Sequence, residues 1–178
     1  IANITFLPAD KNKACQGFDT GPGNMLMDAW VQKHKDQNYD PQGQWAAGYN
    51  ADKKLVRHLM QDPFILQTPP KSTGRENYNL RWLNEQLGNF SDISTDIMQA
   101  SLFEFTAQSI QLAVENYAEE INTLIVCGGG AHNKHLMHLL QQQLPEINIK
   151  TSDDYGLHPD WVEAVAFAWL AKQTLENQ

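Results

Sequence analysis

A wholly apolar run followed at once by three glycines is the feature that most constrains the fold of this chain. Residues 123–127 read TLIVC, and residues 128–133 read GGGAHN. Short apolar runs rich in β-branched residues are typical of strands that are buried on both faces and pair in parallel. A helical pattern follows over about residues 134–144. The order of strand, glycine loop and helix predicts an α/β fold in which a ligand can approach the loop backbone.

The glycine loop matches neither of two common nucleotide-binding motifs. Asn133 stands where the third glycine of the dinucleotide fingerprint falls, and the Gly-Lys-Ser/Thr sequence of a phosphate-binding P-loop does not follow. A glycine-rich turn without a ligand therefore remains an open alternative.

A second motif, residues 17–24 (GFDTGPGN), places a carboxylate beside a helix start. Asp19 ends a short apolar run, and Thr20 and Pro22 suit the beginning of a helix that is expected over about residues 22–35. The N–H groups at a helix start attract anions such as phosphate, so an acid beside them indicates phosphoryl transfer. The alternative is that Asp19 and Thr20 only cap the helix while the glycines form a tight turn.

Two kinds of hydrophobic periodicity divide the rest of the chain into strands and helices. Polar residues and prolines indicate loops at residues 36–49, where Trp45 and Tyr49 are expected to act as packing anchors, and at residues 67–76. Strands are expected over residues 1–8 and 14–19, joined by a turn at 10–13, and over 147–151, and helices over residues 51–60, 79–86, 93–120 and 161–175.

The last expected helix is apolar on nearly all sides, which is typical of a helix in the interior of a larger body. One acid, Glu163, stands near its start. Asp160 and Glu163 have the spacing of a capping box, in which the glutamate reaches back to a backbone N–H. The functional alternative is a carboxylate that points into a cleft shared with Asp19.

Composition and charge exclude several classes of protein. The 178 residues, 42% of them apolar, suffice for one good-sized core. A net charge of −8 argues against a surface for nucleic acid or anionic membranes, and no run approaches the length of a membrane helix. Cys15 and Cys127 give no disulfide framework, so a cytoplasmic location is expected, with Cys127 as a small core residue.

Three histidines are spaced three residues apart, at His132, His135 and His138. Successive steps of three drift around a helix, and the glutamate of an HExxH zinc motif is missing. We interpret the histidines as part of a solvated polar face, and no metal site is expected.

Four motifs together carry a family resemblance. Residues 17–30, 70–76, 126–133 and 163–171 closely resemble, in the same order, motifs of the bacterial anhydro-N-acetylmuramic acid kinases. The resemblance implies α/β architecture: one lobe of an actin/hexokinase-like (ribonuclease H-like) fold, with a mixed sheet flanked by helices and a helical and loop insertion around residues 36–90. Residues 1–178 would form the C-terminal lobe of a two-lobe sugar kinase. The chain opens on a strand without Met, which indicates a fragment, and the resemblance implies that the N-terminal lobe and the first strand of this lobe are absent.

The same resemblance implies an activity. Members of that family use ATP and Mg²⁺ to phosphorylate O6 of 1,6-anhydro-N-acetylmuramic acid while water opens its anhydro ring, which yields N-acetylmuramic acid 6-phosphate for peptidoglycan recycling. A homodimer is implied, and this chain by itself is expected to be inactive. A non-catalytic nucleotide-binding module and a kinase of another sugar remain as alternatives.

Residue roles are carried over by the motif matches. Asp19 occupies the position of the base, and Glu163 that of a second acid that helps to hold the water, although Val162 replaces the Met that usually precedes it. The motif match gives no role to Lys71, Ser72, Thr73, Gly74 and Arg75. This basic loop could bind the sugar carboxylate, brace the lobe or serve the dimer contact, and structural bracing is the favoured interpretation. The resemblance assigns nucleotide contacts to Gly21, Gly128, Gly129, Gly130 and Asn133, and substrate contacts to Gly21, Pro22 and Asn24.

Overall fold

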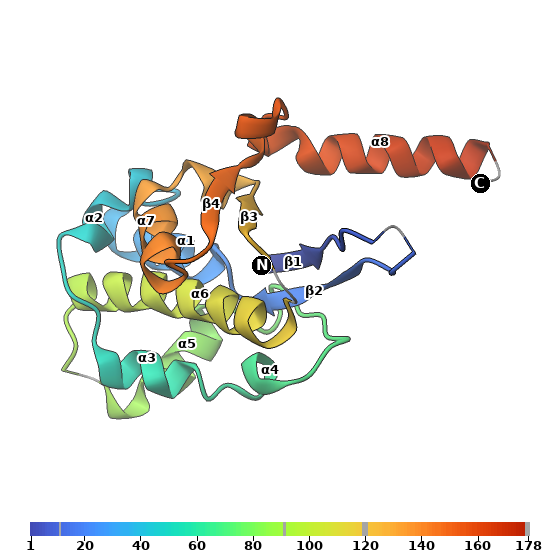
Figure 1. The fold of residues 1–178 in the computed structure, drawn as a ribbon. Helices are drawn as coiled ribbons and strands as arrows, with labels where there is room; N and C mark the ends of the chain where they lie inside the picture. Colours follow the sequence, from blue (N-terminus) through green and yellow to red (C-terminus); the bar gives the residue numbers. More distant parts are fainter. Residues whose placement is uncertain (11, 91, 119–120, 177–178) are drawn as a thin grey trace.

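Four strands form two small sheets in the computed structural model, which describes residues 1–10, 12–90, 92–118 and 121–176 (Figure 1). Strands β1 (Ala2–Phe6) and β2 (Gln16–Gly21) form an antiparallel hairpin. Strands β3 (Thr123–Val126) and β4 (Asn148–Thr151) pair in parallel. The expected hairpin and the parallel pairing are confirmed, although the described strands form two separate pairs rather than one mixed sheet. Residue 11 of the expected turn lies outside the described residues.

Strand β3 is covered on one face, so the prediction that it is buried on both is wrong. Leu124 and Val126 pack against buried clusters, whereas Ile125, between them, is 46% exposed. Side chains alternate between the two faces of a strand. The helical layer meets the face that carries Leu124 and Val126, and Ile125 points away from that layer.

Helices make up most of the rest of the chain, and those expected from the sequence are present with shorter bounds. The longer ones are α1 (Met25–Lys35), α3 (Lys53–Leu59), α5 (Leu80–Gln86), α6 (Thr95–Tyr117), α7 (Lys134–Gln143) and α8 (Val162–Leu175), and two single-turn helices are α2 (Gln44–Ala47) and α4 (Pro63–Leu66). The expected end of the helix over 93–120 falls on residues 119–120, outside the described residues.

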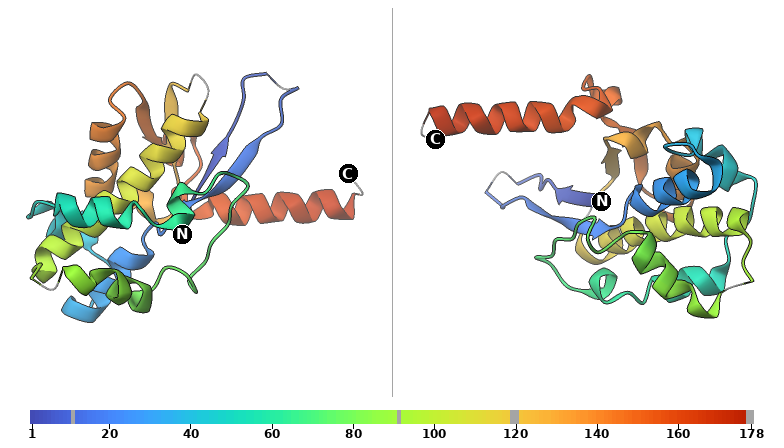
Figure 2. Two further views of the ribbon diagram at one scale, coloured as in Figure 1. Left: turned by 90° about the horizontal axis from the view of Figure 1, so that it is seen from below. Right: turned by 180° about the vertical axis from the view of Figure 1, so that it is seen from behind.

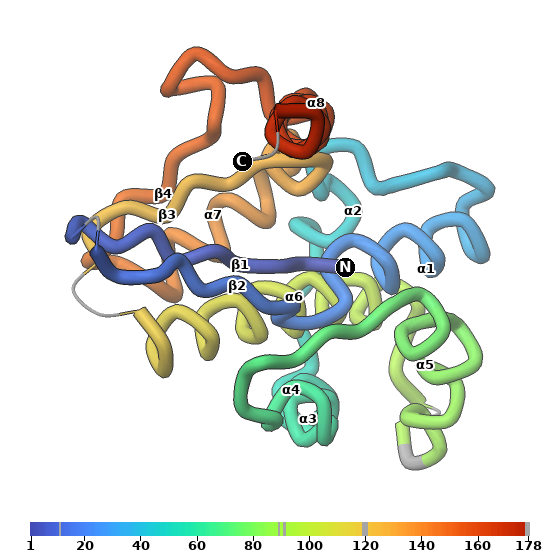
Figure 3. Tube along the Cα trace, turned by 90° about the vertical axis from the view of Figure 1, so that its right-hand side faces the viewer, coloured from blue at the N-terminus to red at the C-terminus, as the bar shows by residue number. Residues whose placement is uncertain are grey.

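Helix α6, 23 residues long, is the centre of the molecule (Figures 1 and 3). Ser94 caps its start by accepting a hydrogen bond from the N–H of Ile97. Its first half packs with α1, α2, α3, α5 and α7 around a buried cluster that includes Phe103 and Phe105. Its second half packs against the β1–β2 hairpin, where Val114 joins a smaller cluster. The helix therefore supports the strand that carries Asp19.

The expected insertion at residues 36–90 contains α2, α3, α4 and α5. Trp45 packs against the main cluster and donates from Nε1 to Asp96 Oδ1 at 2.6 Å, which confirms its expected role as an anchor. The same expectation for Tyr49 is wrong, because its side chain is 48% exposed. The backbone N–H of Tyr49 closes the turn onto Ala46 O at 3.1 Å, so the turn is held without the ring.

Helix α8 is exposed along its whole length, which contradicts the expected interior location. It lies on the opposite side of the strands from α6 and extends away from the body (Figures 1, 2 and 3). None of its residues is buried, and it packs against the short 3₁₀ segment η5 (Pro159–Trp161). Apolar character on all sides favours burial only where a second surface covers the helix. Among the described residues, neither α8 nor another helix is long and apolar enough to cross a bilayer.

Candidate active site

Asp19 lies near the end of β2, on the side of the strand that faces away from the smaller core cluster. Its neighbours Phe18 and Thr20 are buried, and the ring of Phe18 meets Tyr117 edge-on at 5.2 Å. Thr20 Oγ1 donates to Ala2 O at 3.3 Å. Thr20 therefore bonds within the hairpin rather than to the start of α1, and the N-cap residue of α1 is Asn24. The alternative that Asp19 and Thr20 cap this helix is wrong.

The turn after β2 displaces the start of α1 from the expected position. The helix begins at Met25 rather than at Pro22, because Gly23 has a left-handed φ of +57°. A Cβ at Gly23 would lie 2.7 Å from Ala2 N, so the turn accepts no side chain there. Asn24 is the N-cap residue and makes no side-chain capping bond, and its amide is not engaged in holding the helix.

The loop that begins at Lys71 holds the carboxylate of Asp19. Ser72 Oγ donates to Asp19 Oδ2 at 2.9 Å, and the N–H of Thr73 donates to the same oxygen at 2.8 Å. The N–H of Asp19 donates in turn to Lys71 O at 3.2 Å. A cavity of about 300 Å³, lined by β1, β2, Lys71 and Ser72, opens beside Asp19. A larger hollow of about 520 Å³ lies over α4 and α5 and includes no predicted site residue.

Lys71 braces this loop against α4. Its side chain is buried, and Nζ donates to the carbonyl oxygens of Phe64 and Ile65, both at 3.0 Å. The ammonium also lies 4.8 Å from the centre of the Phe64 ring. Burial lowers the pKa of Lys71, and the nearby charge of Asp62 opposes that shift. These contacts agree with the interpretation of the loop as a structural brace.

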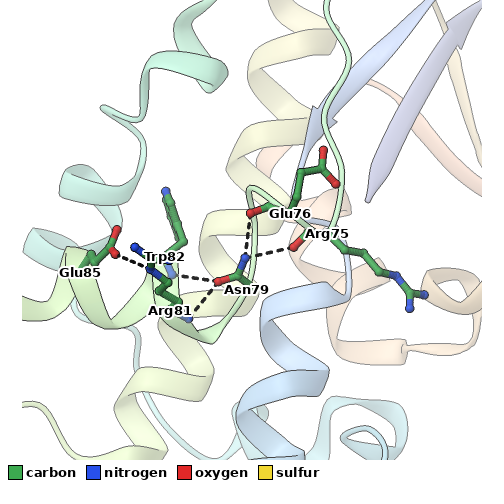
Figure 4. A network of polar contacts seen from close by, with 6 residues as sticks. All are labelled: Arg75, Glu76, Asn79, Arg81, Trp82 and Glu85. Carbon is green, nitrogen blue, oxygen red and sulfur yellow. Dashed lines mark hydrogen bonds and ion pairs between the residues drawn. The ribbon is translucent and has the colours of Figure 1, made fainter.

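The far end of the loop is fixed by Asn79 (Figure 4). Its Oδ1 accepts from the N–H groups of Arg81 and Trp82, both at 3.0 Å, and so caps α5. Its Nδ2 donates to the carbonyls of Arg75 and Glu76 at 3.1 and 2.9 Å. Figure 4 shows the Arg75 side chain extending away from this network.

The glycine loop meets the Asp19 motif through Asn24. A Cβ at Gly129 would lie 3.3 Å from Asn24 Nδ2, and one at Gly130 would lie 3.8 Å from Asn24 Oδ1. Gly128 has a φ of +70°, and no atom lies within 4 Å of the place a Cβ would take. Two motifs that are more than a hundred residues apart therefore face one another, with open space beside the Gly128 backbone.

Three other predicted ligand residues have local structural roles. Asn133 Oδ1 accepts from the N–H of Leu136 at 3.1 Å and caps α7. Gly21 is buried, and a Cβ there would lie 2.9 Å from Ser109 Oγ on α6. The carbonyl oxygen of Pro22 accepts a hydrogen bond from the N–H of Met25 in the turn. Their ligand contacts stay predictions.

Glu163 lies in the exposed first turn of α8, and the capping box predicted for it does not form. Asp160 belongs to the preceding η5 segment, and the N-cap residue of α8 is Trp161, which makes no side-chain capping bond. The Asp160 carboxylate instead lies 2.8 Å from His132 Nε2. Together with the bond from Gly128 N to Pro159 O at 3.0 Å, this contact ties the glycine loop to the start of α8.

Cys127, at the end of β3, connects Glu163 to the glycine loop. Burial raises the pKa of the Cys127 thiol, and the charge of Glu163 raises it further. The residue as a whole is exposed, so its predicted role as a core residue is wrong. The strand ends where the helical layer ends, and position 127 therefore lies at the rim of the site.

Asp28 lies within the motif at residues 17–30, and the sequence patterns assign it no role. Burial raises its pKa to about 6, and the charge of Asp40 adds to the rise. It is the acid in the first turn of α1, and that position alone indicates nothing beyond a favourable helix dipole interaction.

The histidines do not form a metal centre. His132 and His138 are exposed, as expected for a polar face, whereas His135 is half-buried with its ring 5.4 Å from that of Phe103. Burial lowers the pKa of His135. Within the described part of the chain, no group of three or more His, Cys, Asp or Glu side chains is arranged to hold a metal ion.

The fold and the site define a mixed α/β domain in which Asn24, five residues after a carboxylate near a strand end, approaches a glycine-rich loop between a strand and a helix. A model of one protein family, described as anhydro-N-acetylmuramic acid kinase, matches residues 1–178. The chain belongs to the anhydro-N-acetylmuramic acid kinase family.

Individual relatives agree with the family match. The chain is similar to proteins named anhydro-N-acetylmuramic acid kinase from Coxiella burnetii (strain RSA 493 / Nine Mile phase I), at 48% identity over 178 residues, and from Pseudomonas syringae pv. tomato, at 43% over 177 residues. A third relative of the same name, from Thiobacillus denitrificans, is 46% identical over 179 residues. These alignments cover 99–100% of this chain and 48% of each relative. The chain thus spans about half the length of the relatives it matches.

Proposed function

We propose that the complete protein containing this chain is an ATP-dependent kinase of 1,6-anhydro-N-acetylmuramic acid, to which this chain contributes the general base and the adenosine loop. One observation carries the proposal: Asn24, five residues after Asp19, packs against Gly129 and Gly130. An acid suited to sugar chemistry and a loop suited to a nucleotide therefore share one side of the domain. The names of the family and of the relatives support the choice of substrate.

Four bond changes describe the reaction. The oxygen of water bonds to the anomeric carbon while the bond from that carbon to O6 breaks. O6 then bonds to the γ-phosphorus of ATP while the bond from that phosphorus to the β–γ bridging oxygen breaks, and ADP leaves. The proton that the water loses passes to a carboxylate, and we propose Asp19 for this role.

Glu163 is proposed to orient the same water. Its charge raises the pKa of the thiol of Cys127, the residue that precedes the glycine loop. A second acid near the base assists by accepting a hydrogen bond from the attacking water. Its exposed position on α8 leaves it free to turn toward a bound sugar.

The glycine loop fits a nucleotide. The empty space beside Gly128 and its positive φ allow a ligand to lie against the backbone, and we propose that Gly128, Gly129 and Gly130 contact adenosine and the α-phosphate. Mg²⁺, when bound, offsets charge on the phosphoryl oxygens. We propose that the ion is bound mainly through phosphate oxygens and water, as is usual for Mg²⁺ in kinase sites.

The remaining proposals concern the whole protein. Residues 1–178 would be its C-terminal lobe, with the rest of the nucleotide cleft in the half of the relatives that this chain does not cover. The free thiols of Cys15 and Cys127 support a reducing, cytoplasmic location. A homodimer is proposed from the family resemblance, and light scattering on the full-length protein tests it.

Replacing the base tests the proposal. In the full-length enzyme, Asp19→Asn should retain binding of ATP and sugar but lower kcat by about 10²–10⁴-fold. The measurement is ADP release that depends on the anhydro sugar, with binding followed by calorimetry. Retention of near-normal turnover would remove Asp19 from the role of base.

Labelled water separates the proposed reaction from the alternatives. Only hydrolytic opening of the anhydro ring places solvent oxygen on the anomeric carbon, so ¹⁸O should appear there in the product. A kinase of another sugar would transfer phosphate without that label, and a non-catalytic module would release no ADP. The 178-residue chain by itself should show little activity, because it spans about half of the relatives' length.

A further inference from the structure

The carboxylate of Asp19 is held by donors from one short loop. Ser72 Oγ and the N–H of Thr73 both reach Oδ2, at 2.9 and 2.8 Å. Among the hydrogen bonds of the described residues, none ends on Oδ1. The two oxygens are therefore distinguished, because one is fixed by the loop and the other remains available to accept a proton.

The donors are themselves fixed at both ends of the loop. On one side, the N–H of Asp19 bonds to Lys71 O, and Lys71 Nζ is anchored on two carbonyls of α4. On the other side, Asn79 holds the carbonyls of Arg75 and Glu76 while it caps α5 (Figure 4). A hydrogen bond from an anchored donor fixes a side chain more effectively than one from a mobile donor.

The helices that anchor the loop are also joined to each other. Tyr78 is 1% exposed, and its hydroxyl donates to Asp62 Oδ1 at 3.0 Å. Asp62 also accepts from the N–H of Phe64 and so caps α4. The bond between Tyr78 and Asp62 therefore joins the starts of α4 and α5, the two helices between which the loop runs.

From this geometry we infer that Ser72 and the backbone of Thr73 are positioning groups, which hold Asp19 so that Oδ1 faces the attacking water. The inference rests on the proposed role of Asp19 as the base. A base acts efficiently only within hydrogen-bond reach of the proton it removes, and small misplacements are costly. The loop thus has a role in catalysis without touching the reacting atoms.

Steady-state kinetics of the full-length enzyme test the inference. Ser72→Ala should lower kcat about tenfold, the effect of losing one hydrogen bond to a charged group, and change the KM values for sugar and ATP less than about twofold. Ser72→Thr keeps a hydroxyl and should restore most of kcat. Asn77→Ala is the matched control, because it removes the 3.1 Å bond from Asn77 Nδ2 to Thr73 Oγ1 and no contact to Asp19.

A double variant identifies the route of the effect. If Ser72 acts through Asp19, then Asp19→Asn combined with Ser72→Ala should be no slower than Asp19→Asn alone. Additive losses, an unchanged kcat in Ser72→Ala, or an equal loss in Asn77→Ala would each overturn the inference. Near-normal turnover of Asp19→Asn would instead overturn the proposed function, so the two failures are distinguishable.

Discussion

The two acids of the candidate site are supported in opposite ways. Asp19 lies on a strand between buried residues, and three hydrogen bonds join it to the loop at residues 71–73. Glu163 lies on α8, a helix without a buried residue, whose Phe167 and Trp169 are 70% and 59% exposed. One carboxylate is fixed by hydrogen bonds, whereas the other lies on a helix that no described element covers.

This difference agrees with the two roles proposed for these acids. A fixed carboxylate suits a base whose distance to the substrate must be constant. A carboxylate on an exposed helix suits a group that reaches its place when a covering surface or the substrate arrives. An exposed apolar face of this kind is typical of an interaction site.

The largest contrast is expected in stability. In the 178-residue chain, Phe103→Ala should lower the free energy of unfolding by about 3–5 kcal/mol, because Phe103 is 1% exposed in the main cluster. Phe167→Ala on α8 should change it by less than about 0.5 kcal/mol. Urea unfolding followed by circular dichroism measures both. Comparable losses for the two variants would mean that α8 packs on this domain.

The second largest effect on the free energy of unfolding is expected when the anchor formed by Lys71 is lost. Lys71→Met leaves the carbonyls of Phe64 and Ile65 without their donor, at a cost of about 1–3 kcal/mol. The matched control is Lys172→Met on α8, which breaks an exposed ion pair with Glu176 at 3.9 Å and should cost less than about 0.5 kcal/mol. Equal effects of the two substitutions in urea unfolding would show that the loop is not anchored as described.

The acids themselves should differ in their effect on turnover. In the full-length enzyme, Glu163→Gln should lower kcat by about tenfold, less than Asp19→Asn, because a glutamine still accepts a hydrogen bond from water. The comparison uses sugar-dependent ADP release for both variants. A larger loss for Glu163→Gln than for Asp19→Asn would reverse the assignment of the base.

The smallest expected effect concerns pH. Because burial raises the pKa of Asp28 to about 6, above its usual 3.8, the folded chain binds this proton more tightly than the unfolded chain. The contribution to stability is therefore present below about pH 4 and is lost as pH rises through 6. Asp28→Asn should thus become more stable relative to the parent between pH 4 and 7, by about 1 kcal/mol once solvent screening is allowed for.

The matched control for this effect is Gln173→Asn on α8, which exchanges one uncharged amide for another. Its difference from the parent should not vary over the same pH range, as measured by urea unfolding at each pH. A pH-independent difference for Asp28→Asn would contradict the raised pKa.

Local patterns predicted much of the fold. The β-branched run at 123–127, the glycines after it and the helical periods gave the strands and most helices, because propensity and periodicity act over a few residues. The start of α1 was misplaced because a left-handed Gly23 delays the helix. The burial of β3 and α8 was overestimated, because burial depends on which surfaces pack against an element.

The site was predicted less completely than the fold. Asp19 and the glycine loop were identified by motif, but the contact from Ser72 to Asp19 joins positions separated by 53 residues. No local period encodes such a contact, and the motif that contains Asp28 gives no sign of its burial. The capping box expected at Asp160 does not form for the same reason: the carboxylate bonds instead to His132, which is 28 residues away in the sequence.

A crystal structure of the full-length enzyme with the anhydro sugar and a non-hydrolysable ATP analogue tests the central claim most directly. The account predicts an ordered water within about 2.6–3.2 Å of Asp19 Oδ1 and facing the anomeric carbon, with Oδ2 still bonded to Ser72 and Thr73. An Asp19 side chain turned away from the sugar, with no water between them, would contradict it.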